Sequence, residues 1–110
     1  MAMATHAPPV LLADLIEEWI TAEPARAPST VYRDRWGADV IVSHFGEDRE
    51  AATISRDEVL EFRDLLVETF TGSTPRIILR LLVRPLERAH VEGRLDRCVV
   101  AGMLLSTRRS

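Results

Sequence analysis

Residues 76–92 constrain the fold of this chain more than any other stretch. Seven apolar residues there would lie on almost every side of a helix: Ile77, Ile78, Leu79, Leu81, Leu82, Val83 and Leu86. A helix that is apolar nearly all round is usually covered by its neighbours. The stretch therefore predicts a central helix. Pro85 lies inside it and predicts a kink near Leu81, because proline removes the hydrogen bond to the carbonyl four residues earlier.

Two helices are expected in the first half of the chain. Apolar residues spaced three and four apart predict one over 10–22, which ends before Pro24 because the residue preceding a proline avoids the helical region. A prolyl linker over 24–28 follows. The second helix is predicted from an N-cap at Ser29 or Thr30 to about Phe45, with Gly46 closing it. Its apolar stripe is interpreted as Tyr32, Trp36, Val40, Ile41 and Phe45.

The two remaining helices begin with recognisable capping signals. Ser55 and Glu58 have the spacing of a capping box, which predicts a third helix from there to about Phe70, with Val59, Phe62, Leu66 and Phe70 on its core face. The central helix is predicted to begin with Thr74 as N-cap and Pro75 at the first helical position, and to end at Gly93.

The expected fold class is all-α, a compact four-helix bundle, since no strand pattern or internal repeat is present. The chain has 110 residues, which is enough for one domain. Residues 1–9 predict a disordered leader, 10–98 the helical domain, and 99–110 an apolar segment with a frayed tail. The apolar stretch 99–105 is a candidate fifth helix. It either docks back onto the bundle, which we favour, or offers a hydrophobic contact surface to a partner.

Charge is unevenly distributed along the chain. All 14 basic residues are arginine, and 17 acidic residues give a net charge of −3, so the chain as a whole lacks the basic character of many nucleic-acid-binding domains. Residues 1–72 hold six arginines and 14 acids, a net charge of −8, whereas residues 73–110 hold eight arginines and three acids, a net charge of +5. The asymmetry directs attention to the second segment.

Several classes of protein are disfavoured by the sequence. A lone cysteine, Cys98, cannot form an internal disulfide, and no apolar run is long enough to span a membrane. The first residues lack the features of a secretory signal, so a cytoplasmic protein is expected. No metal site or cofactor is expected. His44 and His90 are predicted at helix ends, and no nucleophile or acid–base arrangement is visible, so we expect no enzymatic activity from this chain alone.

Arginines repeat at every fourth position of the central helix: Arg76, Arg80, Arg84 and Arg88. One interpretation is a face that follows DNA phosphates from a helix N-terminus, since guanidinium groups offer forked donors. The other is a solvated face that binds nothing. Thr30 and Arg33 near the start of the second helix have the same two interpretations, phosphate ligands or an ordinary cap with Arg33 paired to Asp34 or Glu23.

The order of these signals resembles the N-terminal core-binding domain of tyrosine recombinases, also called phage integrases. The similarity begins with the helix LLADLIEEWI at 11–20 and continues through Ser29–Trp36. It then includes Phe45-Gly46, Ile54, Asp57, Val59, Phe62-Arg63-Asp64 and Leu66, followed by Ser73-Thr74-Pro75-Arg76, Arg80-Leu81 and ERAHVEGRLDR at 87–97. It covers about residues 10–98. The sequence departs from the family where Cys98-Val99 replaces Asn-Pro and where Pro85 interrupts the fourth helix.

The resemblance implies a SAM-like orthogonal bundle that forms one half of a clamp around double-stranded DNA. It implies a role in DNA integration and recombination, with other recombinase subunits or a catalytic domain as partners and with the catalytic residues outside these 110. By position, the DNA contacts would be Thr30, Arg33, Ser73, Thr74, Arg76 and Arg80. The alternative function is a stand-alone helical module, derived from a recombinase, that binds another protein.

Overall fold

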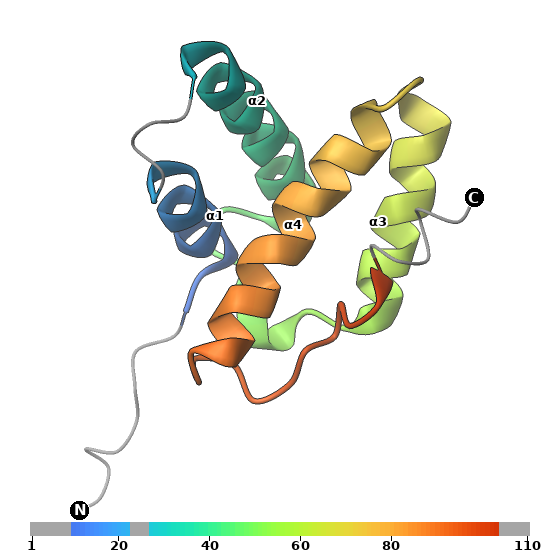
Figure 1. The fold of residues 1–110 in the computed structure, drawn as a ribbon. Coiled ribbons are helices and arrows are strands. Elements are labelled where there is room, and N and C mark those ends of the chain that lie inside the picture. The colour runs from blue at the N-terminus through green and yellow to red at the C-terminus, as the bar shows by residue number, and fades with distance from the viewer. Residues whose placement is uncertain (1–9, 23–26, 104–110) are drawn as a thin grey trace, which may run out of the picture.

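The computed structural model describes residues 10–22 and 27–103 (Figure 1), so the predicted leader 1–9 and the frayed tail lie outside the described residues. In these residues the α-helices are α1 (Leu12–Thr21), α2 (Pro28–Phe45), α3 (Arg56–Thr69) and α4 (Thr74–Val91), and a 3-10 turn, η2, lies at Ala51–Thr53. Within the described residues the sole β contact is an isolated bridge between Leu11 and Glu50. The expected all-α class is confirmed for this part of the chain.

Helix α4 is the centre of the fold, as the apolar stretch predicts. It packs against α1, α2 and α3, and Figure 1 shows it crossing the molecule with α1 and α2 on one side and α3 on the other. Eight of its residues are buried, Pro85 among them. The helix continues through this proline to Val91. Burial of α4 on several sides therefore positions the other three helices.

The starts of α2 and α4 differ from those predicted. Helix α2 begins at Pro28 with Ala27 as N-cap, not at Ser29 or Thr30, and Ser73 rather than Thr74 is the N-cap of α4. Proline fits the first turn because the N–H that it lacks has no partner inside the helix. Pro28 therefore extends α2 by a residue or two and places Thr30 inside its first turn.

The predicted apolar stripe of α2 is wrong in its first half. Tyr32 is 78% exposed and Trp36 is 42% exposed, while Gly37, Ile41 and Phe45 form the buried face. A Cβ added at Gly37 would lie 3.1 Å from Cδ2 of Leu81. The absence of a side chain there lets α2 approach α4 closely, and this contact turns Tyr32 and Trp36 away from the core.

The capping box of α3 is confirmed in full. The Glu58 backbone N–H donates to Ser55 Oγ at 3.1 Å, and the Ser55 N–H donates to Glu58 Oε1 at 2.9 Å. Arg49 also donates to Glu58 Oε1 at 2.7 Å, which ties the preceding loop to the start of the helix. The core face of α3 holds Val59, Phe62 and Leu66, as predicted, whereas Phe70 at the C-cap is half-buried.

Residues 94–103, which we call the C-terminal strap, close the bundle. Val100 and Met103 are fully buried, and the Arg56 guanidinium donates to the carbonyls of Val99 and Ala101 at 3.0 Å each. The docking favoured for the apolar segment is therefore confirmed for residues 99–103. Residues 94–102 form turns and irregular backbone, Met103 is helical, and residues 104–105, which would continue the candidate fifth helix, lie outside the described part of the chain.

Candidate nucleic-acid interface

The predicted DNA contacts fall at the N-terminal ends of α2 and α4. Thr30 and Arg33 lie in the first two turns of α2, Ser73 is the N-cap of α4, and Thr74, Arg76 and Arg80 occupy the first two turns of α4. These two helix ends lie on the same side of the molecule, at the top of the view in Figure 1. The helices come together farther along, where Gly37 meets Leu81 and Ile78.

A hollow of about 210 Å³ lies between α1, α2 and α4. It is lined by Trp19, Thr30, Asp34, Ile77, Arg80 and Leu81. The hollow brings together two of the predicted contacts, Thr30 and Arg80, with a carboxylate and apolar side chains beside them. The other four predicted contacts do not line it. The structure thus places all six at the starts of these two helices but joins only two of them in one concave site.

The arginines of this region differ from the others in their partners. In the described part of the chain, the side chains of four arginines make no ion pair or hydrogen bond: Arg33, Arg76, Arg80 and Arg97. Three of the four are the arginines predicted to contact DNA. All three are exposed, so their guanidinium groups are open to an external anion.

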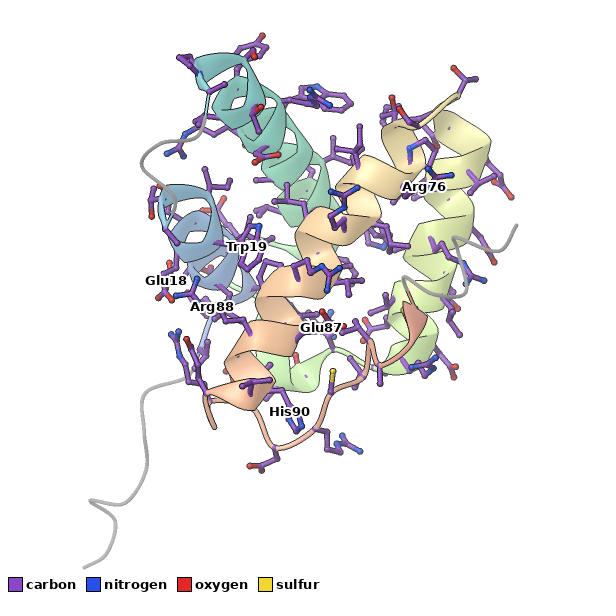
Figure 2. All side chains as sticks on the ribbon, viewed as in Figure 1. Glu18, Trp19, Arg76, Glu87, Arg88 and His90 are labelled. Atoms are coloured by element: carbon purple, nitrogen blue, oxygen red, sulfur yellow. The ribbon has the colours of Figure 1, made fainter. Side chains whose placement is uncertain are left out.

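The second half of the arginine repeat on α4 behaves differently. Arg84 pairs with Glu87 at 3.1 Å, and Arg88 pairs with Glu92 at 3.1 Å. Figure 2 shows Arg76 near the N-terminal end of α4, with Glu87 and Arg88 toward the other end. Arg84 and Arg88 therefore fit the second interpretation of the repeat, a solvated face whose charges are paired within the protein. The free positive charge of α4 is concentrated in its first two turns.

Two of the three acidic residues of α1 form ion pairs with other elements. Arg35 of α2 donates to both carboxylate oxygens of Glu17 at 2.7 and 3.1 Å. Arg94 of the C-terminal strap does the same to Glu18 at 2.7 and 3.3 Å. These hydrogen bonds lower the pKa of both glutamates below the ordinary value. The pairs join α1 to α2 and to the C-terminal strap at the surface and offset two of its negative charges.

Two aromatic residues were not recognised in the sequence as surface groups. Tyr32 and Trp36 lie one turn apart on α2, on either side of Arg33 in the sequence, and both are exposed. The Trp36 ring packs edge-on against Phe70, with ring centroids 5.5 Å apart. Gly37 is the sequence feature from which this exposure could be predicted. A glycine inside a helix often marks a close helix contact and so identifies the buried face.

The remaining reactive side chains have structural contacts. His44 packs against the rings of Phe45 and Phe62, and His90 Nδ1 lies 3.1 Å from the Leu95 carbonyl. Cys98 is half-buried. Among the described residues no polar side chain is buried, and no cluster of three or more His, Cys, Asp or Glu has the geometry of a metal site. None of the described helices is long and apolar enough to cross a membrane.

The chain matches no protein-family model, no curated protein and no solved structure. Fold and surface chemistry therefore define its class: a helical bundle, in its described residues, with three unpaired arginines near the N-terminal ends of two helices. Any function assigned to it depends on the chemistry of that surface.

Proposed function

We propose that this chain is a DNA-binding module that contacts the phosphate backbone of duplex DNA through the N-terminal ends of α2 and α4. In this proposal it serves site-specific recombination, as the SAM-like core-binding domain of a tyrosine recombinase, and binds DNA rather than catalysing a reaction. The observation that carries the proposal is that Arg33, Arg76 and Arg80 have no ion-pair or hydrogen-bond partner among the described residues. Arginines elsewhere on α4 and beside α1 are paired.

The chemistry of the two helix ends suits a phosphate. Arg76 lies in the first turn of α4, where backbone N–H groups lack intrahelical partners and the helix dipole favours an anion. The hydroxyls of Ser73 and Thr74 are close in sequence to these groups, and the hydroxyl of the N-cap Ser73 makes no capping hydrogen bond. An unpaired guanidinium can bind a phosphate without first giving up an ion pair within the protein.

The expected binding is weak and strongly dependent on salt. With about three phosphates neutralised, log K falls against log salt with a slope of about −2.7, which is about 500-fold for a tenfold rise in salt concentration. The acidic first part of the chain repels DNA and lowers the affinity further. Measurements at low ionic strength are therefore the appropriate starting point.

Fluorescence anisotropy of a labelled duplex, titrated with protein at low salt, tests the proposal. The variant R76A/R80A removes the two unpaired arginines of α4, and R84A/R88A removes the two paired ones. Both change the net charge equally, so general electrostatic attraction affects them alike. We expect R76A/R80A to weaken binding at least tenfold and to reduce the salt slope by nearly two, with a much smaller effect of R84A/R88A. Equal losses in the two variants, or no salt-dependent binding, would overturn the proposal.

The alternative, a module that binds another protein, predicts a contact surface formed by residues 99–105 and the acidic helices. Within the described part of this segment, Val100 and Met103 are buried in the chain's own core. Light scattering after size exclusion tests for self-association through other surfaces. A monomer that binds duplex DNA supports the proposed function over this alternative.

A further inference from the structure

The exposed rings of Tyr32 and Trp36, here called the aromatic face, are unused by a protein that contacts only phosphates. Tyr32 is 78% exposed although it lies inside a helix that contributes to the core. Trp36 is 42% exposed, and its edge-on contact with Phe70 fixes the orientation of the indole. The face is thus a partly preorganised aromatic surface open to solvent.

Two unpaired arginines of the described residues belong to the helix ends near these rings, Arg33 on α2 and Arg76 on α4. Arg33 follows Tyr32 directly and lies three residues before Trp36, and its guanidinium has no partner in the described part of the chain. Phe70, which contacts Trp36, is four residues before the first residue of α4 and six before Arg76. The contact of Trp36 with Phe70 therefore places the aromatic face toward the end of the molecule where α4 begins, and Arg33 is its neighbour in the sequence of α2.

We propose that the aromatic face stacks on unpaired bases of single-stranded DNA while Arg33 and Arg76 hold the neighbouring phosphates. Stacking on aromatic rings combined with arginine contacts to the backbone is the common chemistry of single-strand binding. The bases of an intact duplex are covered by their neighbours, so rings at the protein surface gain nothing there. This inference rests on the proposed function and adds a substrate class to it, DNA with a single-stranded stretch.

The charges favour this occupant over a protein partner. A hydrophobic peptide would cover the rings but leave Arg33 and Arg76 without counter-charges. A strand of DNA supplies a flat ring and a negative charge at every nucleotide, which matches an aromatic residue and an arginine placed side by side. Binding is therefore expected to depend on both the bases and the phosphates of the strand. The two contributions can be tested separately.

The first experiment separates bases from phosphates. The variant W19F leaves Trp36 as the only indole, since the chain has two tryptophans. Titration with oligothymidylate at low salt is expected to quench the Trp36 fluorescence. An abasic oligonucleotide of the same length keeps the phosphates and lacks the bases, and we expect it to bind at least fivefold more weakly with little quenching. Equal affinity and equal quenching for the two oligonucleotides would overturn the inference.

The second experiment changes the ring itself. Stacking of one base on an aromatic side chain corresponds to about 5- to 150-fold in affinity, so Y32A is expected to weaken oligothymidylate binding by a factor in this range. Y32F keeps the ring and is expected to bind as the unchanged chain does. V91A, which truncates an 83% exposed apolar residue at the far end of α4, is the matched surface control. A Y32A affinity equal to that of V91A would contradict stacking.

The outcomes distinguish the inference from the proposed function. If duplex binding requires Arg76 and Arg80 but Y32A binds oligothymidylate normally, the inference alone fails. If neither duplex nor oligothymidylate binding responds to R76A/R80A, the proposed function fails with it. If Y32A instead converts a dimer to a monomer in sedimentation, the aromatic face is a protein interface, and the inference is overturned.

Discussion

Gly37 controls how closely α2 approaches α4, and its replacement by alanine gives a sharp test of the packing. The new Cβ would lie 3.1 Å from Leu81 Cδ2 and 3.7 Å from Ile78 Cγ1. Carbon atoms in optimal contact are about 3.5–4.0 Å apart, so Leu81 would have to move by roughly half an ångström. Leu81 is 5% exposed and is held by the surrounding core, which resists such a movement.

Two opposing contributions determine the sign of the effect. Alanine is more favourable than glycine inside a helix by about 1 kcal/mol. Overpacking of a filled core costs about 1–3 kcal/mol. With a single methyl against the end of one leucine, we take the middle of that range, and G37A is expected to lower the free energy of unfolding by about 1 kcal/mol. For a domain of this size the corresponding fall in Tm is about 4–8 °C.

Urea unfolding, followed by far-UV circular dichroism, measures the change in the free energy of unfolding. The effect of G37A is measured once in the unchanged chain and once in a chain that carries L81V. Valine lacks both δ carbons, so the 3.1 Å contact disappears. There, G37A is expected to stabilise the protein by about 1 kcal/mol, because only the gain in helix propensity remains. The reasoning is refuted if G37A stabilises the unchanged chain, or if the sign of its effect is the same in both backgrounds.

Three further predictions concern stability, each measured by urea unfolding. S55A removes the acceptor of the α3 capping box and is expected to cost about 1 kcal/mol, while S55T, which keeps the hydroxyl, should cost much less; equal losses would contradict a role for the side chain. M103A is expected to cost about 2–5 kcal/mol because Met103 is 1% exposed, whereas V91A should leave stability unchanged. The ion pairs of Glu17 and Glu18 hold the pKa of each carboxyl below its unfolded value near 4.5, so their stabilisation is present above that pH and is lost as the pH falls through the lowered values. E17Q/E18Q should therefore lose less stability on acidification than the unchanged chain, and parallel pH profiles would contradict this.

Local interactions explain which parts of the fold could be predicted from the sequence. The capping box at Ser55 and Glu58 is formed by residues three apart, so the sequence alone places the start of α3. The central position of α4 follows from its own composition, because no other arrangement covers so many apolar side chains. The start of α3 depends on contacts within one helical turn, and the central position of α4 depends on the composition of that one segment.

Contacts between distant segments explain what could not be predicted. The buried face of α2 depends on the fit of Gly37 against α4, which apolar periodicity does not register, and so the Tyr32–Trp36 stripe was assigned to the wrong side. The division of the arginines into paired and unpaired groups is equally non-local: Arg94 pairs with Glu18, 76 residues away. The sequence could therefore name Arg76 and Arg80 but could not show that, within the part of the chain that the structure describes, they lack partners while Arg84 and Arg88 have them.

The C-terminal strap has a consequence for the order in which this chain can fold during synthesis. Val100 and Met103 fill the core, and Arg56 holds the strap against the start of α3. The apolar surface that these residues cover remains open to solvent until residue 103 has left the ribosome. The last of the four helices ends at Val91, before Val100 and Met103 are added. The nascent chain therefore passes through a stage with an incomplete core, whose exposed apolar surface can bind chaperones or start aggregation.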